Sequence, residues 1–189
     1  MLDYNEITVR KYIVVDGTPY EVLSSHVSRK QARKPVNQTK LRNMISGKVT
    51  EKPFHQSEKV KEADIAIKKI KYLFENKGQI WFSEENDPSK RFELSGEIVG
   101  DKIKFVKQNS LVDALVFSDE IIGIKFPIKV ELKVKEAPDA VKGNTAQGAS
   151  KQITLETGAV INAPMFINEG DIIRVNIDTG DYAERVEKN

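Results

Sequence analysis

Apolar and polar residues alternate with a period of two along most of this chain, and that period constrains it to β-strands rather than helices. The first example is residues 9–15, followed by Asp16-Gly17 and then by residues 20–23. An Asp-Gly pair between two alternating runs predicts a β-hairpin closed by a two-residue turn. No stretch shows the 3.6-residue period of an amphipathic helix of ordinary length.

A second hairpin follows the first. Residues 36–44 and 48–54 both alternate, and the pair Ser46-Gly47 lies in the turn between them. Between the two hairpins, at residues 28–35, the alternation stops and positive charge accumulates. We therefore expect this segment to be a loop that connects two strands at one end of a small barrel.

The alternation returns in two further blocks beyond residue 65. In the first, strands are expected at residues 66–74, 79–83, 92–94, 102–107, 111–118 and 120–127, with one short helical turn within 95–100. In the second, they are expected at residues 130–135, 153–156, 159–163 and 170–177, with a short last strand after Tyr182. Short strands with turns every ~8–12 residues suit a small antiparallel barrel such as the five-stranded OB-fold. The chain is thus predicted to be all-β, with three consecutive small barrels at residues 1–64, 65–128 and 129–189.

Composition narrows the classes of function. The 189 residues include no cysteine and only two histidines, His26 and His55. Disulfides, thiolate metal sites, cysteine nucleophiles and histidine-rich metal sites are therefore excluded. No apolar run approaches the length of a membrane span, and the first residues have no apolar signal region. These features predict a cytoplasmic protein that is not an enzyme, with no metal, no cofactor and no membrane partner.

Charge is distributed unevenly along the chain. Residues 1–71 contain 15 lysines and arginines against 8 acidic residues, a net charge of +7. Residues 72–189 contain 15 against 20, a net charge of −5. A positive field concentrated at one end of a molecule favours polyanions, of which nucleic acid is the commonest in a cell. The simpler alternative is a solvated basic loop.

The loop at residues 28–35 carries the most information about binding. The stretch from residue 28 to residue 42 has six cations and no acid. We expect five of them to contact RNA phosphates: Arg29, Lys30, Lys34, Lys40 and Arg42. No aromatic residue lies among these cations, so contacts to phosphate and sugar are expected rather than stacking on bases.

Other candidate sites are weaker. His26 ends a predicted strand and His55 lies in a polar turn, so both are expected to be structural or exposed. The acidic pair Glu84-Glu85 is expected to be a solvated turn, because adjacent strand residues point to opposite faces. Residues 143–148 lack the Gly-Lys-Ser/Thr ending of a phosphate-binding loop. Such a small-residue loop can be a plain turn or can press closely against another surface.

Residues 151–170 carry the most specific motif in the chain. Lys151, Gly158, Pro164 and Gly170 match the lysine, two glycines and proline of the C-terminal signature of bacterial translation elongation factor P. Ile153 and Ala163 replace its usual alanine and valine. Further segments resemble the family in order and spacing, at residues 15–20, 39–43, 46–49, 130–132 and 170–175. The resemblance covers essentially the whole chain.

The resemblance implies an SH3-like (KOW-like) N-terminal domain followed by two OB-folds. It also implies a factor that binds the 70S ribosome between the peptidyl and exit sites, contacts peptidyl-tRNA and relieves stalling at consecutive prolines. The loop of the first domain would reach the CCA end of the tRNA. A loop of the third domain would contact the tRNA elbow through Gly143, Asn144 and Thr145, with Asn144 where the family usually has aspartate.

The loop of the first domain departs from the usual family pattern. Many members have Lys-Pro-Gly-Lys-Gly there and carry a modification on the second lysine, whereas this chain has Arg29-Lys30-Gln31-Ala32-Arg33-Lys34-Pro35. That sequence is more similar to the elongation factor P-like paralogue, whose tip residue is arginine. The resemblance therefore places Arg33 at the tip, with Lys34 and Lys30 as competitors for a modification by a partner enzyme.

Two alternatives remain open at this point. One is the paralogue itself, with an arginine tip and a different range of stall motifs. The other is a general OB-fold nucleic-acid-binding protein, for which Trp81 is the best stacking candidate, although a core position is more common for such a residue. The leading expectation is a monomeric, non-enzymatic translation factor.

Overall fold

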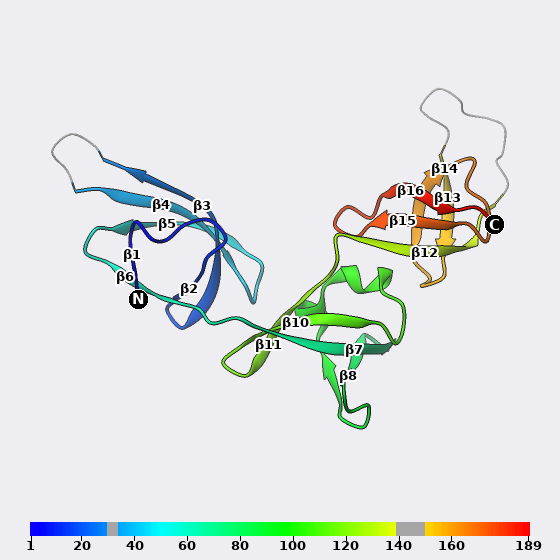
Figure 1. The fold of residues 1–189 in the computed structure, drawn as a ribbon, viewed down its shortest axis with the longest axis horizontal. Helices are drawn as coiled ribbons and strands as arrows, with labels where there is room; N and C mark the ends of the chain where they lie inside the picture. Colours follow the sequence, from blue (N-terminus) through cyan, green and yellow to red (C-terminus); the bar gives the residue numbers. More distant parts are fainter. Residues whose placement is uncertain (30–33, 139–149) are drawn as a thin grey trace. The chain divides into compact units, whose positions relative to one another are not determined.

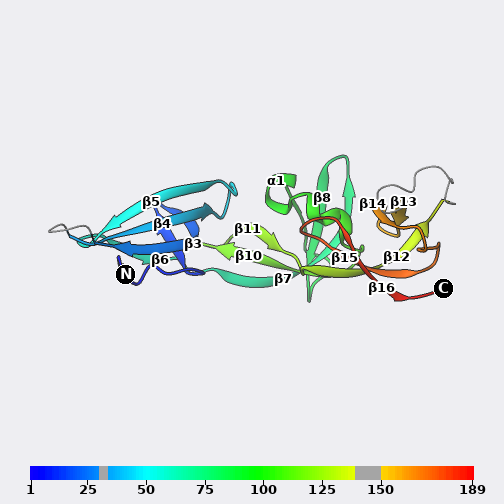
Figure 2. The same cartoon turned by 90° about the horizontal axis from the view of Figure 1, so that it is seen from above.

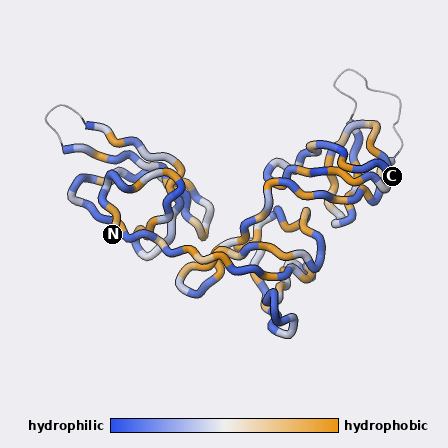
Figure 3. Tube along the Cα trace, in the orientation of Figure 1, coloured by the Kyte–Doolittle hydropathy of each residue, from blue (hydrophilic) through white to orange (hydrophobic). Residues whose placement is uncertain are grey.

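The computed structural model describes residues 1–29, 34–138 and 150–189 of the chain. Over these residues the fold is built from three β-sheets, one of six strands and two of five (Figures 1 and 2). Hydrophilic and hydrophobic residues alternate along the strands (Figure 3). The all-β expectation is therefore confirmed. No helix in the described part of the chain is both long and apolar enough to cross a membrane.

The first sheet contains β1 to β6, in the order β1-β6-β2-β3-β4-β5. The strands are β1 (Leu2–Asp3), β2 (Tyr12–Val15), β3 (Thr18–Ser28), β4 (Val36–Asn43), β5 (Val49–His55) and β6 (Lys59–Glu62). Asp16 and Gly17 join β2 to β3 with φ angles of 50° and 78°. Two consecutive positive φ angles define the type I′ turn, so the first predicted hairpin is confirmed. Both predicted hairpins belong to this one sheet.

Burial in the first sheet follows the alternation. On β4 the residues Asn37, Thr39 and Leu41 are buried, whereas Gln38 and Lys40 between them are exposed. The apolar core beneath the sheet is formed by seven buried side chains: Leu2, Ile7, Ile13, Val22, Leu41, Phe54 and Val60. One face of β4 is thus anchored to a core while the other face is open to solvent.

The second sheet has the order β11-β10-β7-β8-β9. Its strands are β7 (Ala66–Asn76), β8 (Gln79–Glu84), β9 (Arg91–Leu94), β10 (Leu111–Phe117) and β11 (Glu120–Lys125). The expected helical turn is present as α1 (Gly96–Val99).

The strand expected at residues 102–107 is wrong, because Asp101–Phe105 form a 3₁₀ helix. Ile103 and Phe105 alternate with lysines, which imitates a strand in the sequence. Their burial has another cause: Gly100, with φ 76°, ends α1, and the chain then turns so that Phe105 enters the core of the third sheet. The apolar residues at alternate positions are therefore explained by packing of this 3₁₀ helix, and not by a β-strand.

The third sheet has the order β14-β13-β12-β15-β16. Its strands are β12 (Lys129–Glu136), β13 (Ser150–Leu155), β14 (Val160–Pro164), β15 (Ile172–Asn176) and β16 (Tyr182–Glu187). Aliphatic residues that alternate on β12, β13 and β15, such as Leu132, Ile153 and Ile173, are buried in one cluster. The strands lie close to the residues at which the alternation predicted them.

By compactness the chain divides into two units, which are described separately. One contains Met1–Lys68 and Ala114–Ile124, and the other contains Lys69–Asp113 and Lys125–Asn189. Each of the three sheets is nevertheless formed by consecutive strands of the chain. The domain boundaries expected near residues 64 and 128 stay a prediction.

Candidate nucleic-acid interface

The basic loop predicted from the sequence lies at the end of the β3–β4 hairpin. Ser28 pairs with Val36 as the last rung of this ladder. Arg29 and Lys34 lie directly beyond it, and both are exposed. Within the described ranges, neither cation takes part in an ion pair. Lys30 and Arg33 lie outside the described residues, so the structure places two of the loop's four cations.

Asn37 fixes the base of this loop. Its side chain is fully buried, and its Nδ2 group donates hydrogen bonds to the carbonyl oxygens of Tyr4, at 2.6 Å, and Ile7, at 2.9 Å. Thr39 adds a hydrogen bond from its Oγ1 to the carbonyl oxygen of Lys52, at 2.7 Å. Buried polar groups with such partners are costly to displace. The hairpin therefore presents its loop from a rigid support.

Lys40 and Arg42 were grouped with the loop in the sequence, and the structure separates them from it. Both lie on the exposed face of β4. Arg42 is six residues along β4 from Val36, which at ~3.3 Å per residue is roughly 20 Å from the loop. Its guanidinium forms an ion pair with Glu21 on β3. Lys40 lies opposite Glu51 of β5 in the ladder.

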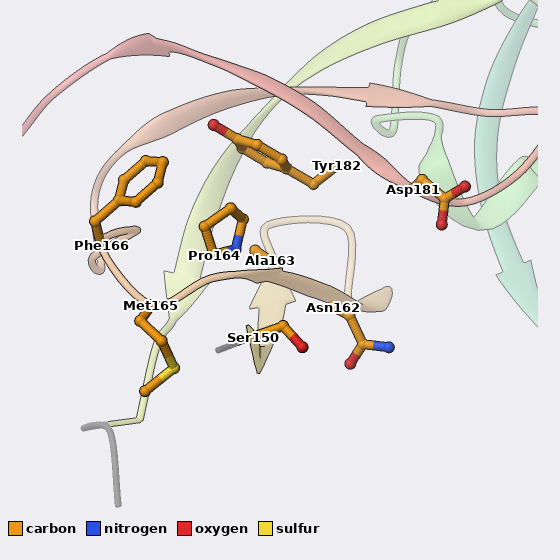
Figure 4. Close-up of a pocket in the computed structure, with 8 residues that line it drawn as sticks. All are labelled: Ser150, Asn162, Ala163, Pro164, Met165, Phe166, Asp181 and Tyr182. Carbon is orange, nitrogen blue, oxygen red and sulfur yellow. The ribbon is translucent and has the colours of Figure 1, made fainter. Parts of the chain in front are cut away.

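The other predicted contact region, Gly143, Asn144 and Thr145, lies outside the described residues. The next described residue, Ser150, borders an open hollow of about 610 Å³ in the third sheet (Figure 4). The hollow is lined by Ser150, Asn162, Ala163, Pro164, Met165, Phe166, Asp181 and Tyr182. These residues come from or directly adjoin β13, β14 and β16, and β14 and β16 are the two edges of the sheet. The sequence did not single out this hollow; the available signal was an aromatic residue near the end of each of two strands, Phe166 after β14 and Tyr182 at the start of β16.

Phe166 in this hollow is held by a network around Asp171. The guanidinium of Arg185 lies over the Phe166 ring, 5.2 Å from its centroid, and also approaches the Asp171 carboxylate at 3.5 Å. Asp171 is buried and accepts backbone N–H hydrogen bonds from Asn168 and Asn189. Burial raises the pKa of the Asp171 carboxyl, but these hydrogen bonds and Arg185 outweigh it and lower the pKa below its usual value.

The remaining candidates have local structural roles. Trp81 is half-buried and its ring stacks on Phe74, with centroids 6.4 Å apart, so that ring face is already used inside the sheet. Asp87 caps its own turn by hydrogen bonds from Ser89, and these lower the pKa of its carboxyl. His26 and His55 are both exposed, at the loop end of the first sheet. Among the described residues, no group of three or more histidines and acids could hold a metal ion.

Three small β-sheets with an exposed basic hairpin end on the first of them define an all-β class of protein. A solved structure with a similar fold is that of eukaryotic translation initiation factor 5A from Methanococcus jannaschii, with a TM-score of 0.51 and 16% identity. The match covers 66% of this chain and 92% of that one.

Two family models match the chain, the elongation factor P KOW-like domain over residues 4–60 and the elongation factor P C-terminal domain over residues 130–185. Elongation factor P of Natranaerobius thermophilus is 40% identical over 187 residues, covering 98% of both chains. That of Carboxydothermus hydrogenoformans is 37% identical, covering 98% of this chain and all of the relative. The chain belongs to the elongation factor P family. It is a translation elongation factor associated with the ribosome, and the family resemblance seen in the sequence is confirmed.

Proposed function

We propose that this factor binds the 70S ribosome beside peptidyl-tRNA and promotes peptide bond formation, relieving stalling at consecutive prolines. The observation that carries the proposal is the exposed pair Arg29 and Lys34 at the end of a hairpin whose base is held by Asn37. Unpaired cations on a rigid support suit a polyanion, because they need no rearrangement to meet phosphates. The factor works in the cytoplasm as a monomer.

The mechanism assigned to the loop is positioning rather than catalysis by the factor itself. Arg33, at the tip, orients the CCA end of peptidyl-tRNA so that the groups of the ribosome act on a better-aligned ester. Arg29, Lys30 and Lys34 contact phosphates, and Lys40 and Arg42 do so to a smaller extent because glutamates face them on the sheet. Gly143, Asn144 and Thr145 contact the tRNA elbow. None of these roles needs a nucleophile, a general base, a metal or a cofactor, so the factor is not an enzyme.

An arginine at the loop tip favours the paralogue within the same family. Arg33 occupies the place at which many members have a modified lysine, and the paralogue would act on a different range of stall motifs. A loop-modifying enzyme is then a further partner. Intact-mass analysis of the native protein, followed by tryptic mapping, tests whether Arg33, Lys34 or Lys30 carries an added group; an unmodified mass removes the modifying partner from the proposal.

The direct test separates positioning from attachment. Arg33→Ala is expected to leave folding and ribosome binding nearly intact, because a single residue of a loop that the sequence predicts to be solvated contributes little to stability. It should nevertheless abolish rescue of polyproline synthesis, since a misplacement of ~1 Å can cost ~100-fold in rate. The measurement is polyproline synthesis on ribosomes saturated with each variant. Full rescue by Arg33→Ala would move the positioning role to Lys34 or Lys30 or out of this loop.

A second variant tests the proposed contact with the tRNA elbow. Replacing Asn144 and Thr145 together with alanine should weaken engagement of the tRNA body and lower occupancy, while rescue at saturation is retained. A double variant with native affinity contradicts the assigned contact.

A further inference from the structure

The exposed face of the β3–β4–β5 ladder changes in charge along its length. Directly paired residues of antiparallel strands share a face. The register gives four rows on this face, which are Ser28–Val36–His55, His26–Gln38–Pro53, Ser24–Lys40–Glu51 and Glu21–Arg42–Val49. The two rows nearest the loop contain no acid, whereas each of the other two combines one cation with one glutamate. The acid-free surface that begins at the loop therefore extends to His26 and Gln38.

His26 and Gln38 are available on this surface. Both side chains are exposed, and within the described residues neither makes a hydrogen bond or an ion pair. His26 lies three residues before Arg29, roughly 10 Å away along an extended strand. An imidazole and a carboxamide side by side offer hydrogen-bond donors for phosphate oxygens, and the carboxamide also offers an acceptor for a 2′-hydroxyl.

We propose that His26, with Gln38 beside it, contacts the sugar–phosphate backbone of the RNA that the loop engages, and that protonation of His26 strengthens this contact. The inference depends on the proposed function, since the loop must first bring RNA to this face. Histidine is the side chain whose charge changes between pH 5 and 8, so the strength of the contact follows pH in that range.

The residues next to His26 in the ladder carry no negative charge. On its own strand the neighbours on this face, Ser24 and Ser28, are uncharged. On β4 it faces Gln38, with Lys40 on the diagonal, and beyond Gln38 lies Pro53 of β5. Strand β2 pairs with β3 only at Thr18 to Glu21.

The loop adds the cations Arg29 and Lys34 at one end of this surface. Two carboxylates border the row of His26: Glu51 in the row farther from the loop, and Glu58, which accepts a hydrogen bond from the backbone N–H of His55 in the row at the loop. Cations and neutral groups surround His26 in these rows, so RNA phosphates are the anions that would meet a protonated imidazole here. Binding of RNA and of the proton therefore favour each other.

His55 provides a matched control on the same sheet. It too is an exposed histidine at the loop end, but its backbone N–H donates to the Glu58 carboxylate at 2.5 Å, and Glu58 N–H donates back to its carbonyl oxygen. A carboxylate is therefore held in the turn directly after His55, whereas the row of His26 contains no acid. It is also on β5, the edge strand, rather than beside the loop-forming strand β3.

The experiment measures affinity for ribosomes carrying peptidyl-tRNA over a salt series, at about pH 6 and about pH 8, for the native protein, His26→Gln and His55→Gln. The native protein should bind about three- to tenfold tighter at the lower pH, because charge-assisted hydrogen bonds are about twice as strong as neutral ones. Its salt slope should be steeper there by up to about one, the value of one phosphate contact. His26→Gln should lose both differences and His55→Gln should keep both.

The inference is overturned if the native protein does not bind more tightly at about pH 6 than at about pH 8. It is also overturned if His26→Gln shows the same gain in affinity as the native protein. Replacing Arg29 and Lys34 with glutamine in the same assay distinguishes the two levels of the proposal. If that double variant binds like the native protein, the loop is not the anchor and the proposed function fails. If it binds weakly while His26→Gln shows the native pH response, only the role of His26 fails. Unchanged thermal unfolding of His26→Gln confirms that the assay compares folded proteins.

Discussion

The cations at the loop end of the first sheet and two arginines of the third sheet differ in whether they are paired with carboxylates. At the end of the β3–β4 hairpin, Arg29 and Lys34 are exposed and make no ion pair with the described residues. In the third sheet, Arg174 bridges Glu131 on β12 and Glu184 on β16, and Arg185 approaches the buried carboxylate of Asp171. An arginine that forms an ion pair with a carboxylate on another strand stabilises the sheet. A cation without an ion pair can instead bind an anion of another molecule. Net charge alone does not reveal this difference.

The largest effect should come from removing the unpaired cations. We expect Arg29→Gln, Lys30→Gln and Lys34→Gln together to lower ribosome affinity a few hundredfold at ~0.1 M salt and to flatten the salt slope by two to three, about 0.9 for each phosphate contact. The measurement is equilibrium binding over a salt series.

The control for this variant is Lys129→Gln, Lys133→Gln and Lys135→Gln on β12, three exposed lysines of the third sheet that change the net charge equally. Native affinity in the loop variant, or an equal loss in the β12 variant, would show that charge alone rather than the hairpin end determines binding.

The next largest effect concerns the paired cations and is an effect on stability. Asp171→Asn should lower the free energy of unfolding by on the order of 2 kcal/mol, because a buried carboxylate loses its charge-assisted hydrogen bonds. The pKa of Asp171 is lowered in the folded protein, so its contribution is complete above the unfolded value of about 3.9 and is lost as pH falls through the folded pKa.

Urea unfolding at a series of pH values tests this. The difference between native and variant should be largest near neutral pH and shrink below about pH 4, while the exposed Glu187→Gln should behave like the native protein at neutral pH. A difference that stays constant with pH would mean that packing, and not the charge of Asp171, stabilises the sheet.

A smaller effect should distinguish an unpaired cation at the loop, Lys34, from a paired cation on β4, Arg42. Lys34→Gln should reduce the salt slope of ribosome binding by about one. Arg42→Gln should reduce it by much less, since Glu21 already occupies the guanidinium. Glu21→Gln should conversely increase affinity slightly by releasing Arg42. Equal losses from Lys34→Gln and Arg42→Gln would show that the ion pair opens when RNA binds.

The smallest effect is expected at Arg174. Its two glutamate partners raise the pKa of its guanidinium, the hydrogen bond to Glu131 contributing most. Arg174→Gln should therefore leave ribosome affinity and salt slope at their native values, as measured beside the loop variants. A reduced slope would place RNA on the third sheet as well.

Much of the fold followed from local sequence. The Asp16-Gly17 turn, the strands around it and the third-sheet strands were predictable because alternation and turn chemistry act over a few residues. β1 and β6, with two and four residues, are too short to show a period, and they form because other strands offer them an edge. The segment at residues 101–105 alternates like a strand, but Phe105 is buried by a neighbouring sheet.

Part of the candidate site could likewise be predicted from the sequence, and part depended on the tertiary structure. The sequence by itself determined where the positive charge lies and that Arg29 and Lys34 flank a hairpin loop, because charge and turn propensity belong to each residue. Only the tertiary structure decided which cations are free. Glu21 meets Arg42, and Asp171 meets Arg185, through register and packing between residues distant in the chain or on different elements. The tertiary structure likewise placed His26 in a row without acidic residues near the loop, because strand pairing decides which side chains share a face.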